Sequence, residues 1–239
     1  MPTTVKFFDP TDILSATDWH LQSRNPSTSK NRAQCLKANG DEAKSQLYGA
    51  QTSDTLTYKA CGTPETIDLS TLHPGVVVSG WHIDSLSIKY NPTDFTEISF
   101  AVHKHDACET GRTSHQDIAN EFVPSVASLP AGFGIPAALK TLVGISDESV
   151  DLSEFTYELS VQHQDETGGS GAWLAAENRD GEETIQISTV GVPSSAPAIT
   201  GWDCTANGSG EGNTAAETGS WTFEHHVGRV VPETSSSST

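Results

Sequence analysis

The sequence predicts an all-β protein, made of two tandem, related β-sandwich or barrel-like units with a short helical connection. Several segments alternate apolar and polar residues, most clearly FTYELSVQHQ (155–164), and this period of two is typical of half-buried strands. Gly, Pro, Asn and Asp cluster between these segments, as turns require. A series of landmarks occurs once in each half of the chain, which predicts an internal duplication.

The landmarks open with Gly80-Trp81 in the first half and Gly201-Trp202 in the second. Trp81 lies 22 residues before His103, and Trp202 lies 23 residues before His225. Upstream, Leu21 and Leu36 are spaced like Leu159 and Leu174, and Gly-Asp-Glu (40–42) matches Gly-Glu-Glu (181–183). An internal repeat gives a chain pseudo-symmetry but does not by itself create a reactive site, so this pattern favours an architectural role over a catalytic one.

The first unit is expected over residues 1–105. Residues 22–33 are polar and partly basic and are expected to form an exposed loop. DTLTYKAC (54–61) alternates as a strand, and the segments 80–90 and 95–104 predict a hairpin around Asn91-Pro92-Thr93-Asp94. The apolar phase changes within 80–90, which predicts a bulge or bend near Asp84.

Residues 106–150 have no counterpart in the other half and are expected to connect the units. PAALKTLV (136–143) predicts a short helix with Pro136 at its first position, and 115–122 favours a strand. This connection could be an arm that packs on a neighbouring subunit, or it could cover its own core.

The second unit is expected over 151–231, followed by a disordered tail at 232–239 (PETSSSST). A loop is expected at 165–173, and Arg179-Asp180-Gly181 predicts a hairpin turn into a strand at 181–191. Glu182 and Glu183 are interpreted as a solvated hairpin end. His225 and His226 are adjacent on a strand, so they should point to opposite faces, one toward the core and bonded to a backbone carbonyl.

The charge excludes some partners. The chain has 13 Lys and Arg against 31 Asp and Glu, a net charge of −18. Residues 1–105 carry 9 basic and 11 acidic side chains, and residues 106–239 carry 4 and 20. Such a surface repels phosphate, so we expect neither specific nucleic-acid binding nor membrane binding.

The sequence also predicts a cellular compartment. It shows no secretory signal and no apolar run of transmembrane length. The four cysteines are therefore expected to be reduced thiols in a protein made in a cytosol.

No catalytic motif, phosphate-binding loop or cofactor signature occurs, which predicts a protein that is not an enzyme and needs no cofactor. The weak candidates for a metal site are His103, His105, Cys108 and His115. Their loose, loop-borne spacing favours ordinary polar histidines over a structural zinc site.

Trp81 and Trp202 are predicted to be core anchors, with Gly80 and Gly201 permitting close backbone approach. A sugar-stacking role is the alternative. It would need an exposed aromatic pair, for which Trp19 and Trp173 are the candidates.

The chain resembles virion structural proteins of tailed bacteriophages, especially tail-tube-like proteins. The resemblance rests on Gly80-Trp81-x-Ile83-x-Ser85-x-Ser87 with Asn91, Asp94-Phe95 and a strand ending at His103, and on FTYELSVQHQDE (155–166) with the hairpin at 177–181. It implies a β-sandwich subunit that assembles with itself and other virion proteins into stacked rings, made in the host cytoplasm and located in the virion. A duplicated subunit would form a trimeric ring with pseudo-sixfold symmetry, and an acidic lumen would let DNA pass without sticking.

Two other functions compete with this expectation. The first is a carbohydrate- or cell-surface-binding β-sandwich module. The second is a metal-dependent enzyme built on the histidine and cysteine candidates named above.

Overall fold

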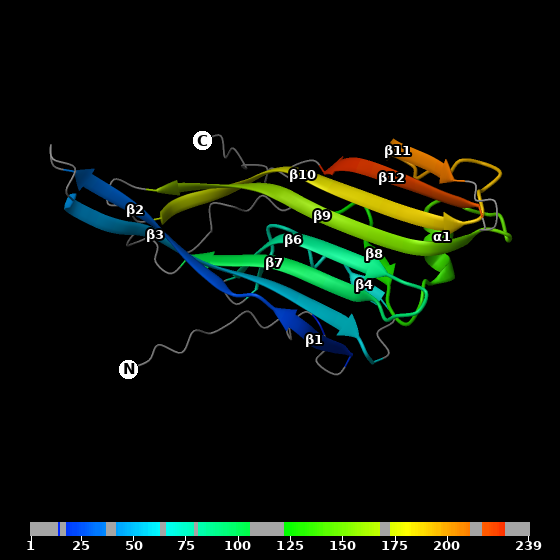
Figure 1. Cartoon of the computed structure of the whole chain (residues 1–239), viewed down its shortest axis with the longest axis horizontal. Coiled ribbons are helices and arrows are strands. Elements are labelled where there is room, and N and C mark those ends of the chain that lie inside the picture. The colour runs from blue at the N-terminus through cyan, green and yellow to red at the C-terminus, as the bar shows by residue number, and fades with distance from the viewer. Residues whose placement is uncertain are drawn as a thin grey trace, which may run out of the picture.

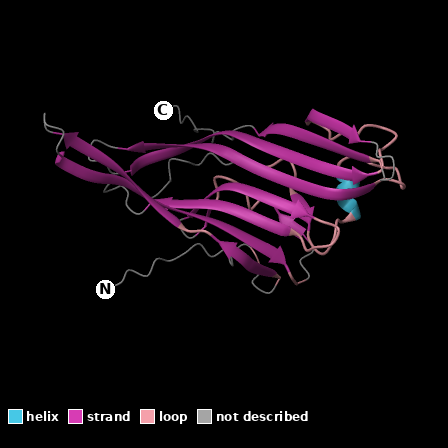
Figure 2. Cartoon of the chain, in the orientation of Figure 1, coloured by secondary structure: helices cyan, strands magenta, loops and turns pink. Residues whose placement is uncertain are grey.

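The computed structural model describes residues 14, 18–36, 42–62, 66–78, 81–105, 122–167, 173–210 and 217–227. Strands dominate this part of the chain (Figures 1 and 2), which confirms the predicted all-β class. The strands of the main sheet are β1 (Trp19–Arg24), β2 (Ser27–Leu36), β3 (Glu42–Ala60), β5 (Val77–Val78), β6 (Trp81–Tyr90), β7 (Glu97–His105), β9 (Asp151–Thr167), β10 (Trp173–Val190), β11 (Asp203–Gly210) and β12 (Thr218–Val227). The remaining elements are β4 (Thr66–Asp68), which pairs with β8 (Ser128–Pro130), and the helix α1 (Ala137–Leu142).

The main sheet runs through both halves of the chain without a break. Its order is β1-β3-β7-β6-β9-β10-β12-β11, with β2 beside β3 and β5 beside β6. Antiparallel pairing of β6 with β9, from Ser85↔Ser160 to Tyr90↔Phe155, joins the halves. The four-strand order is the same in each half: β1-β3-β7-β6 in the first and β9-β10-β12-β11 in the second.

One hydrophobic cluster holds the fold together. It joins the apolar face of the sheet, including Phe100, Tyr157 and Phe223, to buried residues from 66–78 and 122–150. Phe122 lies so close to Gly181 that a Cβ there would stand 2.5 Å from its ring. The described part of the connection, 122–150, therefore covers the chain's own core. Of the strand predicted at 115–122, only Phe122 is described, and it belongs to no strand.

The predicted bulge near Asp84 is confirmed. The β6–β7 register shifts between Ile83 and Ser85. On its other side, β6 pairs with β5 through His82 and Trp81, and with β9 only from Ser85 onward. The bulge thus lies where β6 changes its neighbour.

The predicted short helix is also confirmed, because α1 spans Ala137–Leu142 with Val143 at its C-cap. Pro136 is its extended N-cap residue and not, as was predicted, its first helical residue. Gly144 follows with a φ of +73°. A Cβ at Gly144 would meet the carbonyl oxygen of Ala198 at 2.8 Å, so the turn after the helix requires glycine.

Two predicted connections were wrong. Residues 22–33, expected to be a loop, lie mostly in β1 and β2, which pair with β3. The expected turn at 179–181 is a register irregularity inside the continuous strand β10. In both places backbone pairing with a long neighbouring strand prevails over local composition.

Candidate self-assembly interface

Among the strands that the structure describes, two form edges of the sheet, β11 at one end of the strand path and β1 at the other. All eight residues of β11 are exposed, as are four of the six in β1. β11 (DCTANGSG) contains no Pro or Lys. Natural monomers usually protect a sheet edge with such residues, since its unpaired N–H and C=O groups can pair with another chain. The β11 edge is therefore a candidate pairing surface.

The pairing inside the chain shows what such a junction looks like. β6 is the last strand of the first four-strand set, and it pairs with β9, the first strand of the second set. β11 is the last strand of the second set, and β1 is the first strand of the first set. Antiparallel pairing of β11 with β1 of another copy would repeat the β6–β9 junction.

The registers of the two halves match residue by residue. Leu56 pairs with Phe100 on β7, and Ile185 pairs with Phe223 on β12. If the two halves are aligned so that Phe100 corresponds to Phe223, Leu56 therefore corresponds to Ile185.

Two residues before these positions, each half buries a carboxylate. Asp54 pairs with Val102 and is 2% exposed, and Glu183 pairs with His225 and is 0% exposed.

The buried carboxylates are bonded from equivalent strands. Arg24 of β1 donates through Nε to Asp54 at 2.6 Å, and Tyr157 of β9 donates to Glu183 at 2.7 Å. Arg24 pairs with Leu56, and Tyr157 pairs with Ile185. The two halves thus share a strand order, a register and a polar core position.

Glu183 is the centre of a buried network. Its carboxylate also accepts from the Ser125 backbone N–H at 3.0 and 3.1 Å, from Ser125 Oγ at 2.6 Å and from His225 Nδ1 at 2.9 Å. These hydrogen bonds join the connection between the halves, through Ser125, to β10 and β12. Burial, together with the neighbouring carboxylate of Glu183, raises the pKa of the Tyr157 hydroxyl, so this hydroxyl stays protonated and can donate.

The interpretation of Glu183 as a solvated residue was wrong, although its neighbour Glu182 is exposed. A sequence signal existed, because Glu183 is in phase with Ile185 and Ile187 on the apolar face. The expected backbone carbonyl partner of the core-side histidine is also corrected. His225 is half-buried and bonds to the Glu183 carboxylate, whereas His226 is exposed.

The two landmark tryptophans occupy different environments. Trp81 is 2% exposed in the core, whereas Trp202 is half-buried and stacks on His225 with ring centroids 5.4 Å apart. Gly201 has a φ of +85° with open space around it, and Gly80 lies outside the described residues.

The residue matches between the halves need correction. In the alignment of the two halves by their strand registers, Val102 corresponds to His225. Ile83 of β6 pairs with Val102. Trp202, which stacks on His225, therefore corresponds to Ile83 rather than to Trp81. His103 correspondingly falls on His226 rather than on His225.

Of the four candidate metal ligands, only His103 has a side chain within the described residues. His103 is buried, bonds through Nδ1 to Asp84 at 2.7 Å and stacks on His82. Cys108 and His115 lie outside the described residues, as does the side chain of His105. Within the described ranges no group of three or more His, Cys, Asp or Glu could hold a metal ion.

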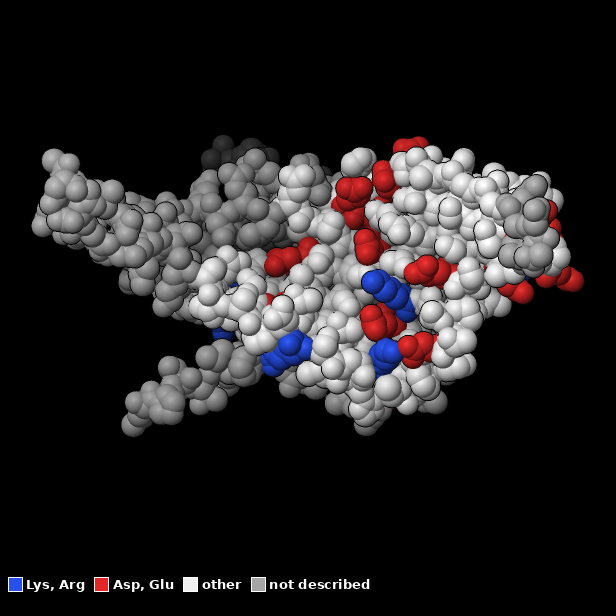
Figure 3. All heavy atoms as spheres, viewed as in Figure 1, with Lys and Arg blue, Asp and Glu red and all other residues white. Residues whose placement is uncertain are grey.

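The face of the sheet away from the core is polar. Across its middle strands it presents exposed or half-buried Ser87, Lys89, Glu158, Gln186 and Ser220. Ser87 Oγ donates to Glu158 at 3.3 Å across the β6–β9 junction. Figure 3 shows acidic and basic side chains lying among uncharged ones on this side of the molecule.

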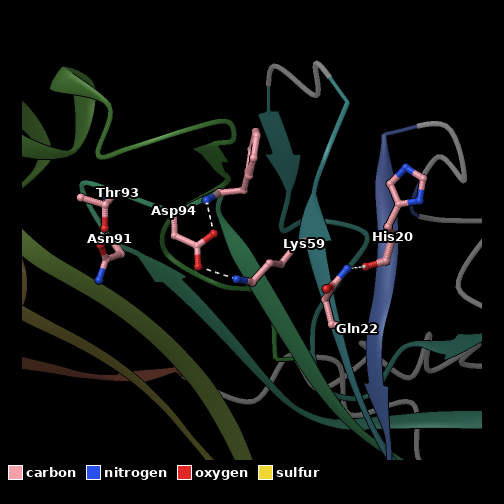
Figure 4. A network of polar contacts seen from close by, with 7 residues as sticks. His20, Gln22, Lys59, Asn91, Thr93 and Asp94 are labelled. Atoms are coloured by element: carbon pink, nitrogen blue, oxygen red, sulfur yellow. Dashed lines mark hydrogen bonds and ion pairs between the residues drawn. The ribbon is translucent and has the colours of Figure 1, made fainter.

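Beside the β1 edge, a small polar network orders the turn between β6 and β7 (Figure 4). Lys59 of β3 bonds to Asp94, whose carboxylate also accepts from the Phe95 backbone N–H at 2.8 Å. Within β1, the Gln22 amide donates to the His20 carbonyl at 3.0 Å. Gln22 is the residue skipped in the β1–β3 register, so this bond lies at the irregularity in the edge strand.

The hydrogen bonds from Lys59 and Phe95 hold the pKa of Asp94 below its ordinary value of 3.8. A carboxyl whose pKa falls on folding stabilises the protein above its unfolded pKa, and that stability is lost as the pH falls through the folded value. We therefore expect Asp94→Asn to reduce the loss of thermal stability below about pH 4. The effect should be small because both partners are partly exposed. Thermal midpoints against pH, with the exposed Glu154→Gln as control, test this; parallel curves for wild type and Asp94→Asn would contradict it.

Comparison with known proteins identifies no family for this chain. No protein-family model matches the chain. No curated protein is similar enough in sequence to count as a relative. In the described part of the chain, no helix has the length and apolarity needed to cross a membrane.

Proposed function

We propose that this chain is a non-enzymatic structural protein of a tailed-bacteriophage virion that assembles with itself into rings or a tube. The observation that carries the proposal is the strand order, which occurs twice in one continuous sheet with β6 and β9 as an internal junction. The free edges β11 and β1 are the two partners that would repeat this junction between copies. We further propose that the repeat is a tandem duplication, supported by the matched registers and the buried carboxylates Asp54 and Glu183.

Such pairing is head-to-tail, because each copy offers a different edge to its two neighbours. Heterologous contacts close into a ring when the rotation per subunit allows it. Three copies with two four-strand sets each would give a ring of pseudo-sixfold symmetry. The sheet twist supplies rotation in a constant direction, as closure requires.

The polar sheet face fits the lumen of such a ring. It carries Glu158 and Glu182 as well as Lys89, in a chain of net charge −18, so the overall charge would repel DNA passing through. Other virion proteins would be the further partners, and the assembled protein would be located in the virion.

The alternative of a carbohydrate-binding module is less well supported. Trp19, one of its two candidate aromatic residues, is 6% exposed and belongs to the core. An exposed aromatic pair was the feature that this function needed.

A cysteine cross-link tests the junction. In the β6–β9 ladder, Tyr90 pairs with Phe155. By the matched registers, Ser209 corresponds to Tyr90 and Leu21 to Phe155. Leu21→Cys with Ser209→Cys, in a background with the four native cysteines changed to Ser, should therefore form disulfides between copies upon mild oxidation.

The control pairs Leu21→Cys with Asn207→Cys, which lies two residues out of register, too far for efficient bridging. We expect a ladder of covalent oligomers and a closed ring for the in-register pair only, with matching particles in negative-stain images. A strict monomer by light scattering at high concentration, without register-specific disulfides, would refute the proposal.

A further inference from the structure

Two long hairpins extend beyond the rest of the sheet at the same end of the molecule (Figure 1). The β2–β3 hairpin continues past Gln51↔His105, the last pair between β3 and β7. The β9–β10 hairpin continues past Gly181↔Val227, the last pair between β10 and β12. When the two halves are aligned by their registers, the points at which the two hairpins leave the sheet differ by one residue. The hairpins are therefore equivalent parts of the two halves.

The two hairpins carry opposite charge. The projecting strands of the first hairpin, residues 30–36 of β2 and 42–50 of β3, contain three basic residues and one acidic one: Lys30, Arg32, Lys44 and Glu42. The projecting strands of the second, residues 163–167 of β9 and 173–180 of β10, contain four acidic residues and one basic one: Asp165, Glu166, Glu177, Asp180 and Arg179. A basic segment is unusual in a chain with 13 basic and 31 acidic side chains.

We infer that the basic β2–β3 hairpin of one copy recognises the acidic β9–β10 hairpin of its neighbour, so that hairpins of alternating charge surround one end of the ring. This inference rests on the proposed head-to-tail ring. In the sheet order, β12 and β11 would separate the acidic hairpin from the basic hairpin of the next copy. β7 and β6 separate the two hairpins within one copy in the same way. Each hairpin would then be flanked on both sides by hairpins of opposite sign.

The distance between adjacent hairpins determines whether their attraction affects the rate of association or the strength of the junction. Neighbouring strands lie about 4.8 Å apart, so three intervals place the nearest strands of adjacent hairpins roughly 14 Å apart. The Debye length is about 8 Å at physiological ionic strength, so salt screens much of the attraction across this gap. Attraction over this distance adds little to the strength of a finished junction. It accelerates encounter and selects the correct order of edges.

Charge reversal of each hairpin tests the inference. The first variant is Lys30→Glu/Arg32→Glu/Lys44→Glu, and the second is Asp165→Lys/Glu166→Lys/Glu177→Lys. The third combines both sets and thus restores alternation with the signs exchanged. Association rates are measured by light scattering at low and high salt, after circular dichroism and thermal midpoints have shown that each monomer is folded.

We expect each single-hairpin reversal to slow association about tenfold at low salt, because all hairpins then have the same sign. The combined variant should recover the wild-type rate, and high salt should remove the differences. Wild-type rates for both single reversals, or a combined variant as slow as either, would overturn the inference.

The Leu21→Cys/Ser209→Cys disulfide separates this failure from failure of the ring proposal. Junctions that form normally while the reversals have no effect would refute only the charge inference. Absence of the disulfide in the chain with unaltered hairpins would refute the ring itself.

Discussion

A proline at one of two adjacent positions in β11 should abolish the proposed self-association while the monomer stays folded. Consecutive residues of an antiparallel strand direct their N–H and C=O groups to opposite sides. Asn207 pairs with Trp221, and Gly208 pairs with Ser220. Of these two β11 residues, one therefore directs its N–H toward β12 and the other toward the free edge.

At the outward position, proline removes a donor that only a neighbouring copy would use, and its ring obstructs the approach of β1. At the inward position, it removes a ladder bond and destabilises the monomer. We expect Asn207→Pro and Gly208→Pro to divide in this way: one lowers the thermal midpoint, and the other leaves it unchanged and gives only monomers by light scattering. Wild-type oligomers from the thermally unaltered variant would contradict the β11 junction.

Glu183→Ala should lower the free energy of unfolding by about 3–5 kcal/mol, because each buried donor left without an acceptor costs about 1–3 kcal/mol and such costs do not add fully. Four donor groups lose their acceptor: the Ser125 N–H, Ser125 Oγ–H, the Tyr157 hydroxyl and His225 Nδ1. The cavity adds to the cost, since Glu183 is fully buried. Because a folded domain is stable by only about 5–15 kcal/mol, this variant should be close to unfolding at ordinary temperature.

Two further variants distinguish the loss of the hydrogen-bond network from the loss of side-chain volume. Glu183→Gln keeps the shape and one acceptor oxygen and should cost less than the alanine. The exposed neighbour Glu182→Gln should change stability by no more than about 0.5 kcal/mol. Urea denaturation of the three variants provides the comparison, and equal losses at positions 182 and 183 would show that the network contributes nothing.

The sequence predicted elements that depend on local pattern. The period of two located the strand around Phe155 and Leu159, and a change in its phase located the bulge at Asp84. Pro136 located the start of α1. The same reasoning could have placed Asp54 and Glu183 in the core, because each is in phase with apolar neighbours. The general expectation that carboxylates are solvated prevailed over the pattern.

The parts that the sequence did not predict depend on partners distant in the chain. β2 shows little apolar alternation, because its pairing with β3 is a matter of backbone hydrogen bonds. The pairing of β6 with β9 joins residues such as Ser87 and Glu158 and leaves no mark in either segment alone. The two sheet edges could not be recognised without this junction, so the candidate interface came from the topology.

The β6–β9 junction also has a consequence for the order of events during synthesis. β6 leaves the ribosome before β9, so for a time the outer side of β6 beyond the Asp84 bulge has no partner from its own chain. During that interval β6 is an edge of the same kind as β11, and β1 of a finished copy could occupy the place intended for β9. If copies assemble as proposed, rapid pairing of β9 with its own chain would therefore protect nascent copies from joining an assembly before their second half has folded.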